Sequence, residues 1–251
     1  MIYIGVLNTE NLNPESEKVI ERIPEEVREK VENTKNENEK RLRAGAYILL
    51  DEIYKKYAEN AKKSPEMPQI LYTGDGKPRF ESVNKGLQNA PFFSISHDTS
   101  LSCVAISDGN LPVGVDVQSL PRGRVRIEKI AERFLAPLRR LDVQFARGEM
   151  MGEVIYEDEP SVKFFFYEIK DGCLCLTPEE KFYKTEISRN DAEADFLAKW
   201  TLLEAIIKAS GGGFGEASSV GQLTDGVISK TVTLSVAKRK YALTVAEIKK
   251  R

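Results

Sequence analysis

The chain has 251 residues, of which 41% are hydrophobic and 30% are charged, a composition typical of a globular protein with a substantial core. Its formal net charge of −2 favours neither nucleic acid nor a membrane surface as a partner. No apolar run approaches the length of a membrane span, and the first residues lack the features of a signal peptide. Three scattered cysteines, Cys103, Cys173 and Cys175, indicate free thiols of a cytoplasmic protein rather than a disulfide scaffold or a zinc site.

The first half is predicted to contain several strands and one long helix. Alternating β-formers predict a strand over residues 1–7. A short charged helix starts at Pro24, and apolar residues spaced by three and four predict a longer helix over residues 37–58. Residues 62–91 are rich in proline and glycine and are expected to form loops. Further strands are predicted over residues 92–96, 101–107 and 113–117, and a helix over residues 127–134.

The second half begins with a different composition and contains an acidic segment over residues 153–160. Apolar runs on either side of Lys170-Asp171-Gly172 predict a β-hairpin. A helix over residues 194–210 ends at three glycines, and strands over residues 231–236 and 241–248 follow. We therefore predict a mixed α+β fold with two similar halves.

The helix after residue 194 holds three side chains of chemical interest, namely Trp200, Glu204 and Lys208. They are spaced by four residues and so lie along one helix face, beside apolar neighbours. One interpretation is an acid at the edge of a buried stripe, where an unpartnered carboxylate would be costly. The other is a surface Glu204–Lys208 pair, worth about 0.2–0.5 kcal/mol. Spacing alone leaves both interpretations open.

Two predicted strands also end in polar residues. The first ends in Ser96-His97, and His97 is the single histidine of the chain, which is compatible with a structural or a catalytic role. In the second, Asp116 and Gln118 alternate with valines and therefore share one strand face. Two oxygen-bearing side chains on a strand, joined by a carboxylate from a helix, would suit magnesium.

Four segments in order give the chain a family resemblance. They are Phe93-Ser94-Ile95-Ser96-His97, Gly114-Val115-Asp116, Arg133-Phe134, and the stretch from Trp200 to Gly211, which reads W-T-x-x-E-A-x-x-K-x-x-G. Together they resemble the Sfp-like 4′-phosphopantetheinyl transferases. Weaker matches lie upstream, at Gly76-Lys77-Pro78 and at Arg41.

The resemblance implies an enzyme with two pseudo-symmetric α/β halves and coenzyme A in a cleft between them. We place the halves at residues 1–117 and 118–251, with an inserted hairpin at about 150–190. The implied reaction transfers 4′-phosphopantetheine from coenzyme A to a serine of an apo acyl or peptidyl carrier protein and releases 3′,5′-ADP. The modified carriers serve fatty acid, polyketide or nonribosomal peptide biosynthesis.

The resemblance also implies roles for individual residues. Asp116 and Glu204 would hold magnesium, with Gln118 binding directly or through water. Glu204 or a metal-held water would take the proton of the carrier serine, and Lys208 would stabilise the departing 3′,5′-ADP. The remaining phosphate contacts would come from Arg41, Lys77, Ser96 and His97.

Two departures from the family pattern support an alternative, a non-catalytic coenzyme A-binding relative of the same fold. Gln118 stands where the family usually has glutamate, and Leu203 stands where it usually has lysine. A third reading is a structural protein in which Glu204 and Lys208 form only a salt bridge. For an active enzyme, the basic segment 121–126 is either a docking surface for an acidic carrier or a solvated loop.

Overall fold

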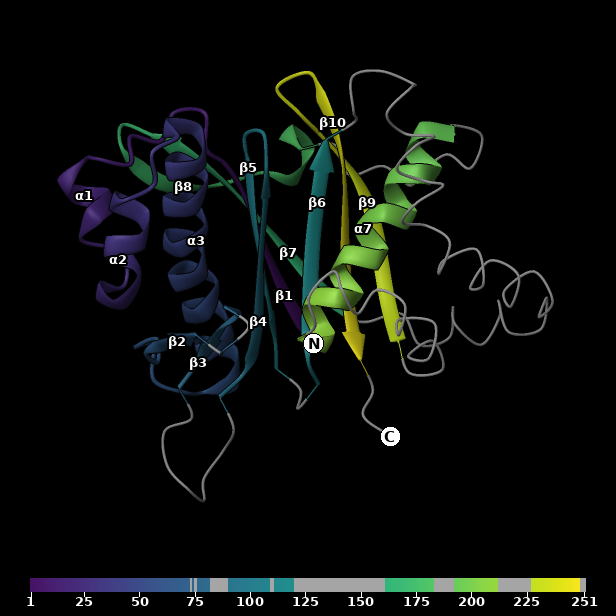
Figure 1. The fold of residues 1–251 in the computed structure, drawn as a ribbon, viewed down its shortest axis with the longest axis horizontal. Coiled ribbons are helices and arrows are strands. Elements are labelled where there is room, and N and C mark those ends of the chain that lie inside the picture. The colour runs from purple at the N-terminus through teal and green to yellow at the C-terminus, as the bar shows by residue number, and fades with distance from the viewer. Residues whose placement is uncertain are drawn as a thin grey trace. The chain divides into compact units, whose positions relative to one another are not determined.

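The protein is described by a computed structural model that covers residues 1–72, 74, 76–81, 90–108, 111–119, 161–182, 192–211 and 227–248. The chain forms two compact units (Figure 1). The first unit contains residues 1–110 and 162–182, and the second contains residues 111–161 and 183–251. Both contain strands and helices, which confirms the predicted mixed α+β class.

The first unit is built on a five-stranded sheet with the order β4-β5-β1-β7-β8. Among these strands, β1 and β7 pair in parallel and the other neighbours pair in antiparallel fashion. The strands predicted from alternation are all present, with ends shifted by a few residues. Their bounds are Ile2–Asn8 for β1, Phe92–Asp98 for β4, Leu101–Ser107 for β5, Val162–Lys170 for β7 and Cys173–Thr177 for β8.

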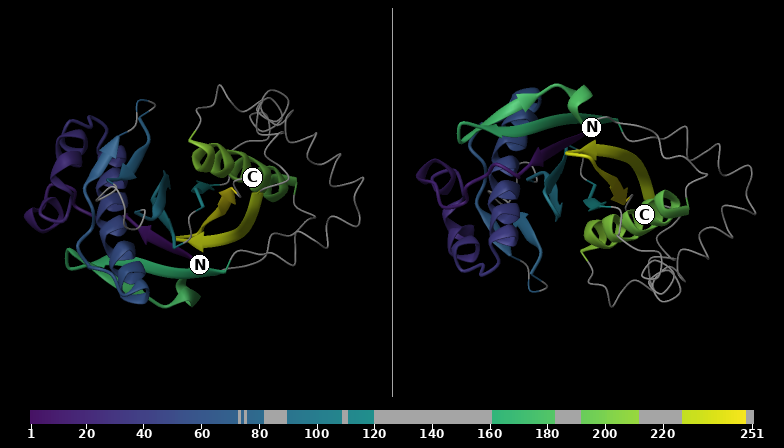
Figure 2. Two further views of the ribbon diagram at one scale, coloured as in Figure 1. Left: turned by 90° about the horizontal axis from the view of Figure 1, so that it is seen from below. Right: turned by 90° about the horizontal axis from the view of Figure 1, so that it is seen from above.

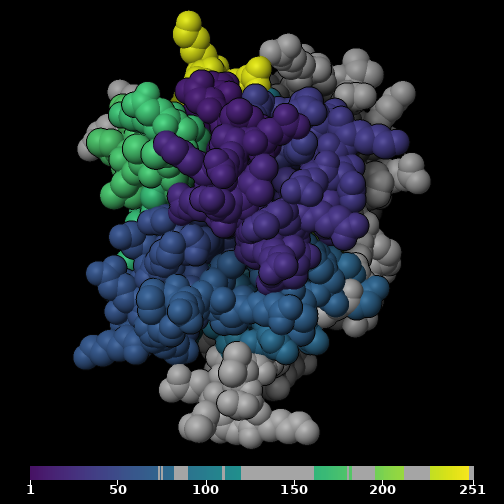
Figure 3. Space-filling view, turned by 90° about the vertical axis from the view of Figure 1, so that its left-hand side faces the viewer, coloured from purple at the N-terminus to yellow at the C-terminus, as the bar shows by residue number. Residues whose placement is uncertain are grey.

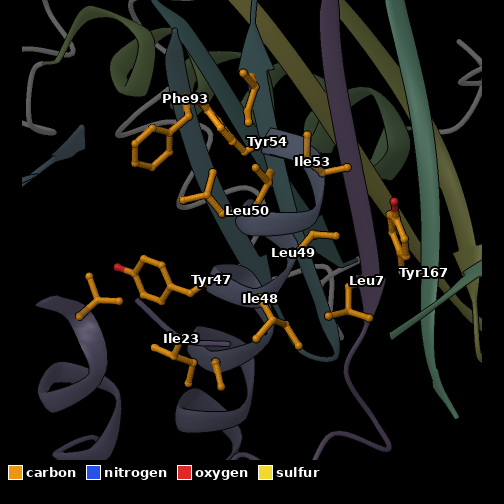
Figure 4. Packing of buried hydrophobic residues seen from close by; sticks show 14 of the residues in the cluster. Leu7, Ile23, Tyr47, Ile48, Leu49, Leu50, Ile53, Tyr54, Phe93 and Tyr167 are labelled. Atoms are coloured by element: carbon orange, nitrogen blue, oxygen red, sulfur yellow. The ribbon is translucent and has the colours of Figure 1, made fainter. Parts of the chain in front are cut away.

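The long predicted helix is α3, Glu37–Ala61, which packs on β1, β4 and β5. It begins at Asn36, whose side chain accepts a hydrogen bond from the Glu39 amide, as an N-cap residue does. Gly5 allows close approach, because a Cβ there would lie 2.5 Å from Cγ1 of Ile53. The apolar residues of the predicted stripe are all buried, namely Leu42, Ala46, Leu49, Leu50 and Ile53. Leu49, Leu50 and Ile53 belong to the core cluster of this unit (Figure 4).

Short elements complete the outer layer of this unit (Figure 3). Helices α1 (Glu17–Ile20) and α2 (Glu25–Glu32) pack on α3, and α2 begins after Pro24 as predicted. A small hairpin of β2 (Ile70–Tyr72) and β3 (Pro78–Phe80) lies within the stretch expected to be loops. Strands of three residues are too short to produce a readable alternation. This hairpin is anchored instead by ring contacts of Phe80 with Tyr54 and Phe93.

The hairpin predicted around Asp171-Gly172 is formed by β7 and β8, and both turn residues have positive φ. A 3₁₀ turn, Glu179–Lys181, follows it. Instead of belonging to the second half as an insertion, the hairpin extends the first sheet, since β7 pairs with β1 along its length. The whole of strand β6, which begins at residue 113, belongs to the second unit. The observed boundary therefore lies before the predicted boundary at residue 117.

The second unit contains an antiparallel sheet with the order β6-β10-β9, crossed on one face by α7 (Figures 1 and 2). The sheet consists of β6 (Val113–Ser119), β9 (Val227–Val236) and β10 (Arg239–Ile248). Helix α7 covers Ala192–Ser210, close to the predicted span, and Gly211 follows with a φ of +80°. The predicted strands and helix of this half are therefore confirmed, although β9 starts four residues earlier than expected.

Several predictions fall outside the described residues. They are the helix over residues 127–134 with the Arg133-Phe134 motif, the basic segment 121–126, the acidic segment 153–160, and the second and third glycines after α7. Within the described parts of the chain, no helix has both the length and the apolar character required to cross a membrane.

Candidate functional site

Helix α7 lies unusually close to β6, because Gly114 has no side chain. A Cβ at this position would lie 1.8 Å from the carbonyl oxygen of Ala205 and 2.7 Å from the amide nitrogen of Ala209. Side chains alternate along a strand, so Asp116 and Gln118 project to the same face as Gly114, the face covered by α7. The close approach thus places the polar residues of β6 under the helix.

Asp116 is 1% exposed and pairs with Lys208 from α7. Nζ of Lys208 lies 2.7 Å from Oδ1 of Asp116 and also donates to the carbonyl oxygen of Val115 at 3.2 Å. A buried carboxylate requires such a charged partner, since an unpaired charge would carry a large desolvation cost. The ion pair joins residues 92 positions apart in the sequence.

Glu204 lies beside the same aspartate. Burial, followed by the negative charge of Asp116 and a hydrogen bond with it, raises the pKa of Glu204 to about 8, against the opposing charge of Lys208. A hydrogen bond with Trp200 has a smaller, lowering effect on this pKa. Two carboxyl groups so close together cannot both ionise cheaply, so the pair retains a proton at neutral pH.

The donor set of this cluster fits a divalent cation. Magnesium binds proteins through one or two carboxylates and takes its other ligands from water and substrate phosphates. Asp116 and Glu204 supply two carboxylates, and Gln118 adds a neutral amide oxygen on the same strand face. Within the described residues no group of three or more histidines, cysteines or acids that could hold a metal gathers.

In the first unit, His97 contacts the start of α3. Its Nε2 lies 3.6 Å from Oε1 of Glu39, an ion-pair distance when the imidazole is protonated. Glu39 also accepts a hydrogen bond from Arg43 at 2.8 Å. Sequence reasoning missed Glu39 and Arg43 as neighbours of the histidine. The available signals were the position of Glu39 three residues after the helix cap at Asn36 and its i,i+4 spacing to Arg43.

The other predicted phosphate contacts have separate surroundings. Arg41 donates to the backbone oxygen of Glu10 and to the side chain of Asn38. Ser96 is paired with Cys103 across the sheet, and strand alternation directs its side chain to the face opposite that of His97. Lys77 follows Gly76, which has a φ of +80°, and is partly exposed just before β3.

The structure therefore brings together Asp116, Glu204 and Lys208 within the second unit. The four predicted phosphate contacts, Arg41, Lys77, Ser96 and His97, all belong to the first unit. Leu203, which departs from the family pattern, is fully buried in the apolar cluster of α7. Leu203 therefore contributes to packing, directly before Glu204 in α7.

Comparison with known proteins gives no family assignment. The chain matches no protein-family model, and no curated protein is significantly similar to it.

Proposed function

We propose that this protein is a magnesium-dependent transferase that moves 4′-phosphopantetheine from coenzyme A to a serine of an apo acyl or peptidyl carrier protein. The observation that supports the proposal most strongly is the cluster of Asp116, Glu204 and Lys208. Two motif segments that are far apart in the chain meet there, as the resemblance to the Sfp-like family requires. A salt bridge on the surface would not need the buried second acid.

Magnesium, when bound by Asp116 and Glu204 with Gln118 nearby, would polarise the phosphoryl group and neutralise its developing charge. The protein's own residues account for the rest of the chemistry. The serine hydroxyl of the carrier loses its proton as its oxygen forms a bond to the phosphorus that carries pantetheine. The bond from that phosphorus to the oxygen of 3′,5′-ADP breaks, and the bond electrons leave with the nucleotide.

Glu204 is the proposed acceptor of the serine proton. Its carboxylate, when ionised, is a general base within the candidate site. Lys208 provides a positive charge next to the acidic pair and is the proposed partner of the departing phosphate. No covalent intermediate on the protein is required.

Arg41, Lys77, Ser96 and His97 are the proposed contacts for the remaining phosphates of coenzyme A. Cationic side chains suit this role, because charge-assisted hydrogen bonds to phosphate are strong. The two pseudo-symmetric halves of the family fold and a cytoplasmic location belong to the same proposal.

The experiment is intact-mass analysis of an apo carrier protein incubated with this protein, coenzyme A and magnesium. We expect a mass gain of one phosphopantetheine, abolished by EDTA and by Asp116→Asn. The matched control is Asp51→Asn, because Asp51 also pairs with a lysine, Lys55, at 2.8 Å but lies on α3 of the first unit. This variant should modify the carrier at the wild-type rate.

Calorimetry with coenzyme A, performed on the same samples, separates the alternatives. Binding of coenzyme A without transfer to any of several carriers would favour the non-catalytic relative, with Gln118 in place of an acid as its structural basis. Absence of both binding and transfer would instead favour a structural role for the Asp116–Lys208 pair.

A further inference from the structure

Three threonine hydroxyls form a continuous chain beside the acidic pair. Oγ1 of Thr244 lies 2.6 Å from Oγ1 of Thr201 and 2.8 Å from Oγ1 of Thr231. This line of hydroxyls links β9, β10 and α7. Thr201 and Thr244 are fully buried. The family resemblance assigns no role to Thr231 or Thr244.

Among these threonine hydroxyls, that of Thr201 also bonds to the backbone of α7. The hydroxyl of Thr201 donates to the backbone oxygen of Leu197 at 2.9 Å. It also lies 3.2 Å from the carbonyl oxygen of Ala198, and in the Thr201–Thr244 and Thr231–Thr244 pairs either hydroxyl can be the donor. The line of threonine hydroxyls thus extends from β9 to the backbone of α7.

The line of threonine hydroxyls connects a neighbour of Asp116 with a neighbour of Glu204. Thr244 is the residue opposite Asp116 in the register of β10 and β6. Thr201 precedes Glu204 by three residues and therefore lies one helical turn away on α7. The hydroxyl contact between Thr244 and Thr201 is a direct link between the neighbours of the two carboxylates.

Apolar packing is joined by directional contacts where α7 lies on the sheet, among them the Lys208–Asp116 ion pair. Small residues line this contact, with Gly114 under Ala205 and Ala209, and with Ala242 and Ala246 in the same cluster. Larger apolar residues of α7, such as Leu203 and Ile207, pack around this contact. Buried hydrogen bonds are directional and costly to break, so they can define one register.

We propose that Thr244 is a positioning residue that, through Thr201, sets the register of α7 and so holds Glu204 against Asp116. The inference rests on the proposed function only in taking the acidic pair as the cation site. The position of α7 on the sheet, which the inference concerns, can be measured without substrate.

The test compares Thr244→Val, which keeps the shape but removes the hydroxyl, with Thr244→Ser, which restores it. Thr233→Val is the matched control, because Thr233 lies on the same face of β9 outside the hydroxyl chain. Hydrogen exchange of α7 is measured without any cation. Magnesium binding is measured through the fluorescence of Trp200, the single tryptophan of the chain, which is hydrogen-bonded to Glu204.

We expect Thr244→Val to increase exchange over α7 and to raise the magnesium concentration for half-saturation about five- to tenfold, the effect of one hydrogen bond on an equilibrium constant. Thr244→Ser should restore both values, and Thr233→Val should match the wild type. Wild-type exchange over α7 in Thr244→Val, or an equal change in Thr233→Val, would overturn the inference. If the wild-type protein shows no response to magnesium, the proposed function fails, while the exchange measurement still decides the role of Thr244.

Discussion

Glu204 illustrates how strongly surroundings alter a single side chain. Its position on α7 beside Asp116 raises its pKa from an ordinary 4.5 to about 8, although Lys208 opposes the shift. The folded protein therefore binds one proton more than the unfolded chain between these two values. Stability must fall as the pH rises through this window, because the unfolded chain releases the proton while the folded state keeps it on a buried acid.

Replacement of Glu204 by glutamine should remove this penalty. We expect Glu204→Gln to be more stable than the wild type by about 2–4 kcal/mol at about pH 8 and nearly equal to it at about pH 5, while transfer activity is lost. Urea unfolding at both pH values measures the difference. Glu15→Gln is the control, because a hydrogen bond from Lys40 lowers the pKa of Glu15 and no gain should follow. An equal gain at both pH values would contradict the explanation.

The same pKa governs cation binding. A divalent ion must displace the proton held by Glu204, so its apparent affinity should increase about tenfold per pH unit from about pH 6 to about pH 8 and level off above. Titration of magnesium followed by the fluorescence of Trp200 provides the measurement. In Glu204→Gln the slope should disappear along with most of the affinity. A pH-independent affinity in the wild type would show that Glu204 is not a ligand.

At the scale of elements, the contact of α7 with β6 depends on one absent side chain. Gly114 leaves room for the backbone of the helix, and a methyl group there would overlap the carbonyl oxygen of Ala205. Backbone atoms within a helix cannot move aside as the end of a flexible side chain can. The glycine of the Gly114-Val115-Asp116 motif is thus explained by packing rather than by backbone conformation.

We expect Gly114→Ala to destabilise the protein by about 2–3 kcal/mol and to weaken magnesium binding, since α7 must shift away from Asp116. Gly74→Ala serves as the control, because open space surrounds that position. It should change the free energy of unfolding by no more than about 0.5 kcal/mol. If Gly114→Ala unfolds at the wild-type urea concentration, the close approach is not essential.

At the scale of the whole molecule, the β7–β8 hairpin is part of the first unit. Its strand β7 runs parallel to β1, and Tyr167 and Ile169 contribute to the core under α3 (Figure 4). The chain leaves this unit after residue 110 and returns to it at residue 162. The first unit is therefore completed only after much of the second half has been synthesised.

A pair of substitutions in the hairpin tests this integration. Ile169→Ala should cost about 2–4 kcal/mol of stability, because it opens a cavity in the core of the first unit. Leu176→Ala, on the neighbouring strand, should be nearly neutral, since Leu176 is 64% exposed. Thermal unfolding of both variants gives the comparison. Similar melting temperatures for the two would mean that the hairpin is an independent appendage.

Local patterns predicted most of the described elements, because helix and strand periodicity depends on near neighbours. The strands β1, β4, β5 and β6 and the helices α3 and α7 follow from such patterns. The small hairpin of β2 and β3 could not be predicted, since its strands are short and are stabilised by aromatic contacts with distant residues. In the candidate site, spacing identified Glu204, Lys208 and Asp116 but left a surface salt bridge open as their explanation.

By itself, the sequence determined the fold class, the helix faces and the acidic and basic residues of the candidate site, since these depend on side-chain chemistry and short-range periodicity. Only the tertiary structure decided that β7 pairs with β1, that Asp116 is buried against Lys208, and that Glu204 retains a proton near neutral pH. The physical reason is that strand pairing, burial and the electrostatic interaction of two carboxyl groups arise between residues distant in the chain. No local pattern encodes those distances.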